Sequence, residues 1–194
     1  MIAIIDYDTG NLRSVENALG RLGAEYILTA DHDAIRRAEK VLLPGVGEAS
    51  TAMEKLRARG LDGLIPTLTQ PVLGICIGLQ LMCAQSEEHN TACMGIFETE
   101  VRRFTAADEL KVPHMGWNRI ENLRSPLFDG LQDGCYVYYV HSYRPDLCPD
   151  AIAVTDYGGA FSATLGRGNF YGTQFHPEKS GAVGERILKN FLTL

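Results

Sequence analysis

The sequence predicts an α/β fold with a mostly parallel central sheet that is flanked by helices and carries a smaller antiparallel extension. Three observations lead to this fold class. Short, unbroken apolar runs occur in the first half of the chain, as in strands that are buried on both faces. Between several of them lie segments whose apolar residues recur at helical spacing. From residue 94 onward, shorter strand-like runs are separated by glycine and proline turns.

The first half of the chain alternates strands with helices. We expect strands where apolar residues stand together, at residues 2–5, 26–28, 41–43 and 72–75. A helix is expected at residues 11–22, because its apolar side chains share one face and a glycine follows. A second helix is expected on the same grounds at residues 49–59, and a third at residues 77–85, directly after the strand at residues 72–75.

The second half contains the antiparallel extension. Its expected strands are residues 97–101, 136–140, 152–155 and 169–175, and a last helix is expected at residues 183–192. The sequence holds no internal repeat, low-complexity segment or linker. We therefore expect residues 1–194 to form a single domain.

Composition and charge argue against several classes of protein. With 45% hydrophobic and 22% charged residues, the chain is unlike disordered or fibrous proteins. Its 24 acidic and 18 basic residues give a net charge of −6, which argues against a nucleic-acid partner. The longest apolar stretch, residues 71–79, is far shorter than the ~20 residues that a membrane helix needs.

The cysteines and the first residues indicate a cellular compartment. The five cysteines are odd in number, and none belongs to a C-x-x-C pair. The first six residues lack the cationic start of a signal peptide. We therefore expect a reduced, soluble, cytoplasmic protein with no membrane partner.

Cys76 is the strongest candidate for a nucleophile. It stands between Gly74 and Gly78 where a buried strand meets a helix, and this pattern is typical of a sharp strand-to-helix turn that exposes its central side chain. The start of the helix would favour the thiolate. The N–H of Ile77 would face the group that the sulfur attacks. The alternative is a small, buried, structural cysteine, as free cysteines usually are.

His176 is the candidate base. It follows an apolar strand, and Glu178 lies two residues further on, where an extended segment would place both side chains on one side. Pro177 would end the strand, so the pair would lie at the edge of the sheet. The alternative is a histidine and a glutamate that stand side by side on the surface.

The turn at residues 44–47 (PGVG) is a third candidate segment. It lacks the third glycine of a dinucleotide-binding fingerprint. Glycines on both sides of Val46 would let backbone N–H groups face a ligand, as an oxyanion hole requires. The signal is weak alone, because many strand–turn–helix units contain glycines.

Two segments together resemble the class I, or triad, glutamine amidotransferases. Residues 74–80 (GICIGLQ) are similar to the nucleophile motif of that family, and residues 175–178 (FHPE) are similar to its His-Pro-Glu motif. The resemblance covers nearly the whole chain. It implies an amidotransferase domain that hydrolyses L-glutamine to glutamate and ammonia, with no metal or organic cofactor.

The resemblance also implies roles for individual residues. Cys76 would attack the carboxamide of glutamine, His176 would transfer protons and Glu178 would orient His176. The N–H groups that would hold the oxyanion belong to Ile77, Val46 and Gly47. Contacts with the substrate are implied for Gln80, Gly45, Ser142 and Tyr143.

Other segments resemble one branch of the family, the glutaminase subunits of imidazole glycerol phosphate synthase in histidine biosynthesis. These segments are residues 44–47, 113–118, 138–143 and 179–181, while Asp8 stands where that branch is expected to have a glycine. The resemblance implies a heterodimer with a (β/α)8-barrel cyclase, which uses the ammonia to make imidazole glycerol phosphate and AICAR. The implied partner contacts are Trp117, Asn118, Tyr138 and Lys179.

Several alternatives stay open on the sequence alone. Trp117 could instead lie in the core, as a single tryptophan usually does. The chain could be the glutaminase subunit of a different synthase, or a cysteine hydrolase that works without a partner. A regulatory binding module with an idle site is the alternative outside enzymology, although Cys76, His176 and Glu178 are all present.

Overall fold

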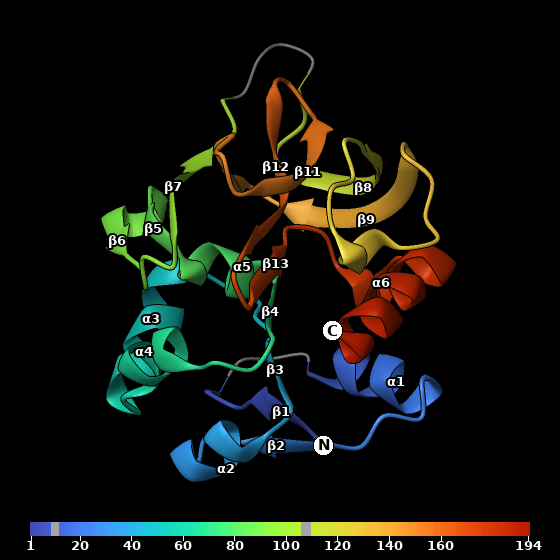
Figure 1. The fold of residues 1–194 in the computed structure, drawn as a ribbon. Coiled ribbons are helices and arrows are strands. Elements are labelled where there is room, and N and C mark those ends of the chain that lie inside the picture. The colour runs from blue at the N-terminus through green and yellow to red at the C-terminus, as the bar shows by residue number, and fades with distance from the viewer. Residues whose placement is uncertain (9–11, 106–109) are drawn as a thin grey trace.

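A central sheet of seven strands runs through the part of the chain that the computed structural model describes, residues 1–8, 12–105 and 110–194 (Figure 1). Its strands lie in the order β11-β12-β13-β4-β3-β1-β2. The five from β13 to β2 are parallel, and β12 and β11 extend the sheet in antiparallel fashion. Their bounds are β1 Ile2–Ile5, β2 Tyr26–Thr29, β3 Lys40–Leu43, β4 Val72–Ile75, β11 Ala151–Asp156, β12 Ala160–Arg167 and β13 Phe170–Thr173.

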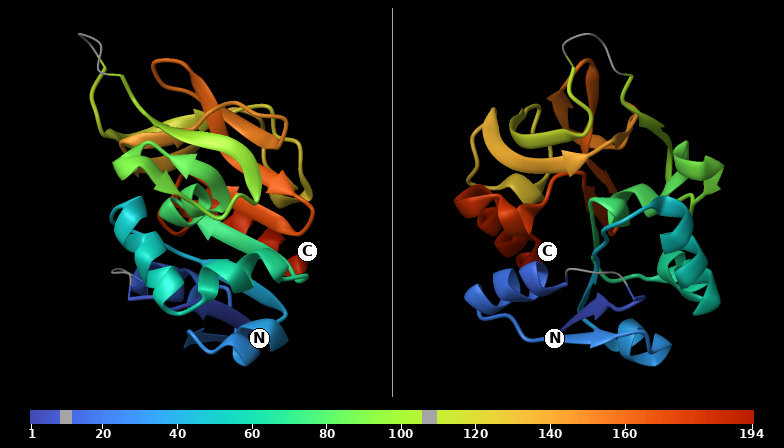
Figure 2. Two further views of the ribbon diagram at one scale, coloured as in Figure 1. Left: turned by 90° about the vertical axis from the view of Figure 1, so that its left-hand side faces the viewer. Right: turned by 180° about the vertical axis from the view of Figure 1, so that it is seen from behind.

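Two smaller sheets accompany the central one in the described residues. The first has the strand order β10-β7-β5-β6, and the second is a hairpin of β8 and β9. Their bounds are β5 Cys83–Ser86, β6 Thr91–Ala92, β7 Phe97–Arg103, β8 His114–Ile120, β9 Cys135–His141 and β10 Tyr143–Pro145. Seen from behind, the hairpin and the four-stranded sheet lie on opposite sides of one end of the molecule (Figure 2).

Helices cover both faces of the central sheet. On one face, apolar residues of α2, α3, α4 and α5 pack against the sheet, and on the other α1, α6 and the β8–β9 hairpin do so (Figure 1). The helices are α1 Arg13–Arg21, α2 His32–Arg37, α3 Ala49–Ala58, α4 Leu61–Leu64, α5 Ile77–Met82 and α6 Gly181–Thr193. The inner parallel strands β1, β3 and β4 are therefore almost entirely buried, which explains their unbroken apolar runs, whereas β2 at the edge of the sheet is partly exposed.

Most expected elements are present, and the fold class is confirmed. The strands at residues 2–5 and 72–75 have the predicted bounds, and the other predicted strands differ by a few residues at their ends. The helix expected at residues 11–22 is α1, and residue 11 lies outside the described residues. Within the described chain, no helix has the length and apolarity needed to cross a membrane.

The helix expected at residues 77–85 is shorter than predicted. It ends at Met82, and the chain continues as β5, which pairs with β7 and β6. Pairing partners far along the chain thus override the local helical pattern. The prediction also lacked α2, α4, β6, β8, β10 and β12.

Candidate active site

Three neighbouring parallel strands end at one edge of the central sheet. In their register, Leu43 of β3 pairs with Gly74 of β4, and Ile75 of β4 pairs with Thr173 of β13. The residues that follow these strands are the turn 44–47, Cys76 and the segment that carries His176. Such an edge is where open α/β sheets bind ligands.

Cys76 stands on a sharp turn between β4 and α5. Its backbone has φ of +54° and ψ of −106°, a conformation that costs energy in a residue other than glycine, and its N–H donates to the carbonyl of Thr173 at 2.7 Å. The flanking glycines permit this turn, because a Cβ at Gly74 would lie 2.7 Å from the backbone of Gly78, and a Cβ at Gly78 would overlap the carbonyl oxygen of Leu43. The cysteine is thus held on a strained elbow.

His176 and Glu178 form a buried pair. Their side chains are each 4% exposed, and His176 Nδ1 lies 2.8 Å from Glu178 Oε1. Burial alone would lower the pKa of His176, but hydrogen bonds to Cys76 and Glu178 and the charges of both groups outweigh it and raise the pKa to about 10. The imidazolium is therefore stabilised beside the sulfur of Cys76.

The pairing of His176 with Glu178 has a different local cause from the predicted one. Residues Pro177–Lys179 form a 3₁₀ turn rather than an extended segment. The hydroxyl of Ser180 donates to the carbonyl of His176 at 2.6 Å, which closes this turn. The carboxylate therefore reaches back to the imidazole across a turn, and the alternative of an exposed pair is wrong.

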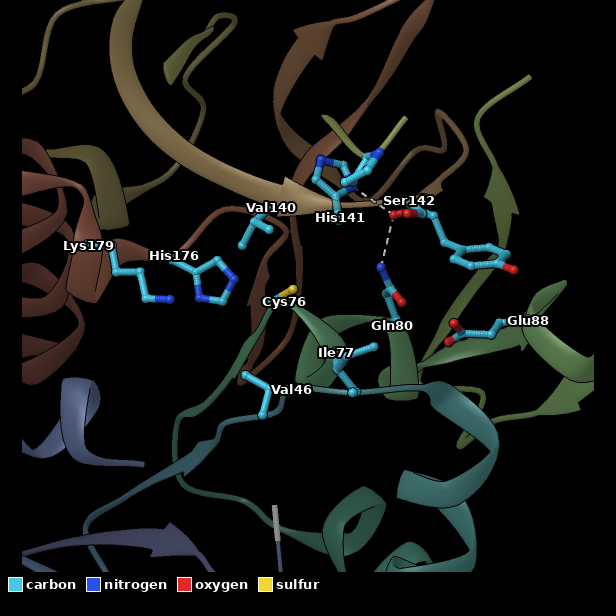
Figure 3. Close-up of a pocket in the computed structure, with 13 residues that line it drawn as sticks. Val46, Cys76, Ile77, Gln80, Glu88, Val140, His141, Ser142, His176 and Lys179 are labelled. Carbon is cyan, nitrogen blue, oxygen red and sulfur yellow. Dashed lines mark hydrogen bonds between the residues drawn. The ribbon is translucent and has the colours of Figure 1, made fainter. Parts of the chain in front are cut away.

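A cavity of about 400 Å³ opens in front of Cys76 and His176 (Figure 3). Most of the predicted site residues line it, namely Cys76, His176, Ile77, Val46, Gly47, Gln80, Ser142, Tyr143 and Lys179. Glu178 lies behind His176. Gly45 is not among the lining residues, because it is buried where a Cβ would meet the Tyr7 hydroxyl and Ile77.

Sequence reasoning missed several residues of this cavity. Glu88 lines it and belongs to a short 3₁₀ turn between β5 and β6, so nothing in its local sequence pointed to the site. His141 also lines it, from the end of β9. Gln174 is fully buried and donates to the sulfur of Cys76 at 3.7 Å, and its place two residues before His176 was the available signal.

Comparison with known proteins agrees with the family resemblance of the sequence motifs. A family model described as "Glutamine amidotransferase class-I" matches residues 3–194. The imidazole glycerol phosphate synthase subunit HisH of Bacteroides fragilis (strain YCH46) is 55% identical over 194 residues, which are 100% of this chain and 99% of the relative. The chain belongs to the HisH family of class-I glutamine amidotransferases.

A further relative and the solved structure of another protein are similar to this amidotransferase over most of their length. The HisH subunit of Shewanella sediminis (strain HAW-EB3) is 46% identical over 98% of this chain and 89% of its own. The structure of a putative GMP synthase protein from Thermoplasma acidophilum has a TM-score of 0.75 at 21% identity, over 99% of this chain and 92% of its own. At that identity the likeness shows the fold alone.

The glycine turn of the amidotransferase is fixed at its start and exposed at its tip. The hydroxyl of Tyr7 donates to the carbonyl of Pro44 at 2.8 Å. Val46 and Gly47 are exposed, and Gly47 has φ of +103°. Asp8, where a glycine was expected, also has a positive φ of +62°, and its side chain pairs with Arg59. The Asp8 carbonyl accepts from Lys55 Nζ at 2.6 Å, which ties the first turn to α3.

The predicted partner contacts of the amidotransferase lie on and beside the β8–β9 hairpin. Trp117 is 55% exposed, so the alternative of a core position is wrong. It pairs with Tyr138 across the hairpin, with ring centroids 6.0 Å apart. Asn118 is half-buried and Lys179 lines the cavity. Met115 adds a further large apolar side chain to this exposed surface.

Proposed function

We propose that this chain hydrolyses L-glutamine at Cys76, as the glutaminase subunit of an imidazole glycerol phosphate synthase in histidine biosynthesis. The observation that carries the proposal is the convergence of Cys76 and His176 at the ends of two paired parallel strands, with Glu178 Oε1 2.8 Å from the imidazole. A nucleophile, a base and a group that orients the base are the three parts that covalent hydrolysis of an amide requires.

The reaction would run in two halves. The Cys76 thiolate attacks the carboxamide carbon of glutamine, and the oxyanion that forms is held by N–H groups of Ile77 and of the turn at residues 46–47. The His176 imidazolium then gives its proton to the nitrogen, which leaves as ammonia and yields a thioester. Neutral His176 next takes a proton from water, the hydroxide attacks the thioester, and glutamate leaves as the Cys76 thiolate returns.

The far wall of the cavity suits the amino-acid end of glutamine. Glu88 brings a carboxylate that fits an α-ammonium group. Oε1 of Gln80 is buried and has no hydrogen-bond partner among the described residues, so it is a second acceptor that a substrate N–H would satisfy. Ser142 and Tyr143 line the cavity beside it and would offer backbone groups.

The product ammonia requires a covered exit. Ammonia released into water would be protonated and lost, so we propose that a synthase partner docks over the cavity. Exposed Trp117 and Met115 and half-buried Tyr138 on the hairpin support this, because aromatic residues and methionine are enriched at interfaces. In the proposed heterodimer, the partner is a (β/α)8-barrel cyclase, and the five free cysteines support a cytoplasmic location.

The test is the release of glutamate from glutamine by the chain alone and in complex with its cyclase and the nucleotide substrate. We expect strong activity in the complex, lost in Cys76→Ala and kept in Cys93→Ala, whose cysteine lies outside the cavity. Equal activity without the partner would favour a free-standing hydrolase. No glutamate under either condition would refute the proposed reaction and favour a binding module.

A further inference from the structure

A chain of hydrogen bonds links the β8–β9 hairpin to the wall of the cavity. His114 of β8 and His141 of β9 are cross-strand partners, and Nδ1 of His114 lies 3.0 Å from Nε2 of His141. The other ring nitrogen of His141, Nδ1, lies 2.7 Å from the carbonyl oxygen of Tyr143. The proposed mechanism uses neither imidazole.

The donor and acceptor of each hydrogen bond in this series follow from its last acceptor, the carbonyl oxygen of Tyr143. A carbonyl oxygen only accepts, so Nδ1 of His141 carries the hydrogen and Nε2 of a neutral His141 accepts from Nδ1–H of His114. Nε2 of a neutral His114 is then an acceptor, and Nδ2 of Asn118 lies 3.3 Å away. The Asn118 amide has this orientation because its Nδ2 also donates to the carbonyl of Asp156, while its Oδ1 accepts from the Arg119 N–H.

The surroundings of both histidines are aromatic. The His114 ring stacks between Tyr139 and Tyr157, with centroids 4.6 and 3.8 Å away. Phe104 packs against His141 at 5.2 Å. Burial lowers the pKa of His114 to about 4 and that of His141 to about 3, so both rings are neutral at pH 7, as the hydrogen bonds require.

The Tyr143 carbonyl is also held from the cavity side. Nε2 of Gln80 donates to it at 3.0 Å, so Gln80 and His141 approach one oxygen from two sides (Figure 3). Nε2 of Gln80 also lies 3.0 Å from Oε1 of Gln174, whose own amide donates to the sulfur of Cys76. Because donors point at the carbonyl from both sides, the network carries no proton. It fixes positions.

We propose that His114 and His141 are positioning residues, which hold the main chain at Tyr143 as one wall of the glutamine pocket and tie that wall to Asn118 on the hairpin. This inference rests on the proposed function. It gives the neutral histidine pair a task in substrate binding that is separate from the chemistry at Cys76. Loss of the pair should therefore act on KM for glutamine more than on kcat.

Substitutions of His141 separate its two hydrogen bonds. His141→Asn keeps a donor at the place of Nδ1 and loses the acceptor for His114. His141→Gln keeps an acceptor at the place of Nε2 and loses the donor to Tyr143. His141→Phe keeps the ring and loses both. Each variant is compared with the wild type in complex with the synthase partner, as steady-state glutaminase kinetics and as a thermal unfolding curve.

We expect KM to rise about tenfold or more in His141→Phe and His141→Gln, with kcat within about threefold of the wild type. The rise in His141→Asn should be several-fold smaller, because the bond to the wall is kept. Equal KM in the Asn and Gln variants would overturn the inference even if the Phe variant fails to fold. A fall in kcat at constant KM would overturn it too.

A second measurement does not depend on activity. The ¹⁵N shifts of the imidazole nitrogens at pH 7 should identify His114 and His141 as neutral rings that carry hydrogen on Nδ1. An imidazolium, or hydrogen on Nε2 of either ring, would overturn the inference. If the wild-type complex released no glutamate while these shifts were as expected, the proposed function would fail and the neutral pair would stand.

Discussion

Replacing Gly78 by alanine tests whether the elbow depends on close packing between α5 and β3. An added Cβ would overlap the carbonyl oxygen of Leu43 and would lie 2.9 Å from its carbonyl carbon and 3.3 Å from its Cγ. Ordinary carbon–carbon contacts are about 3.5–4.0 Å. Because the first two of these atoms belong to the backbone of a central strand, α5 has to move away by a distance on the order of 1 Å.

The expected cost follows from this displacement. Overpacking of a well-packed interior typically costs about 1–3 kcal/mol, so we expect the free energy of unfolding of Gly78→Ala to fall by about that amount. The elbow also carries Cys76 two residues before Gly78. A misplacement of about 1 Å can cost ~10²-fold in rate, so kcat/KM should fall by about two orders of magnitude although Cys76 and His176 are both present.

Gly20→Ala is the matched control. Gly20 lies in α1, nothing stands within 4 Å of the position of its Cβ, and alanine is favoured over glycine in a helix by up to about 1 kcal/mol. It should raise stability slightly and leave activity unchanged. Urea unfolding and glutamate release in the synthase complex measure both effects. If Gly78→Ala matched Gly20→Ala in stability and activity, the explanation of the elbow would be refuted.

Three further variants probe the base, the buried histidines and the hairpin. Burial lowers the pKa of His176, but Cys76 and Glu178 raise it by more. Glu178→Gln should therefore lower this pKa and reduce kcat by about 10²-fold, as measured in a pH–rate profile. A profile equal to that of the wild type would contradict this. Burial lowers the pKa of His114 and His141 to about 4 and 3, against ~6.5 in the unfolded chain. The free energy of unfolding therefore falls as the pH drops below about 6.5, by up to about 3 kcal/mol per pH unit for the two rings together. His141→Phe should roughly halve this part of the slope, measured by urea unfolding at each pH. Trp117→Ala should weaken binding of the synthase partner by about tenfold or more in calorimetry, with the unfolding free energy within about 0.5 kcal/mol of the wild type; undiminished binding would remove Trp117 from the interface.

The sequence predicts an element well where one force decides it. The strand at residues 72–75 is buried on both faces, so its apolar run coincides with its bounds. In β12, by contrast, Ser162 and Thr164 are buried polar residues, and they conceal the strand in a hydropathy pattern. Neither β5 nor the end of α5 could be predicted, because pairing with β7, which follows later in the chain, decides between helix and strand there.

The residues of the candidate site also differ in how far the local sequence determines their place. Cys76 and His176 could be predicted because Cys76 directly follows β4, His176 lies three residues beyond β13, and the ends of parallel strands meet at one edge. Gln174 lies on the same segment as His176 and had that position as its signal. Glu88 and His141, by contrast, approach the cavity from other parts of the fold. Their place depends on how the two smaller sheets pack on the central one, which no local pattern in the sequence expresses.

Strand β9 contacts both the proposed base, His176, and the main chain at Tyr143, the proposed wall of the glutamine pocket. The backbone of Tyr138 in β9 makes two contacts: its carbonyl accepts from the N–H of His176 at 2.9 Å, and its N–H donates to the Ser180 hydroxyl at 2.9 Å. This part of β9 therefore holds the turn that carries His176. Three residues later, His141 holds the carbonyl of Tyr143. The distance between His176 and the wall is thus set along one strand, while Cys76 and His176 are related by the pairing of β4 with β13 in the central sheet. Alignment of the wall with Cys76 therefore depends on the packing of β9 against that sheet, and the exposed face of the same hairpin is where the proposed partner would bind.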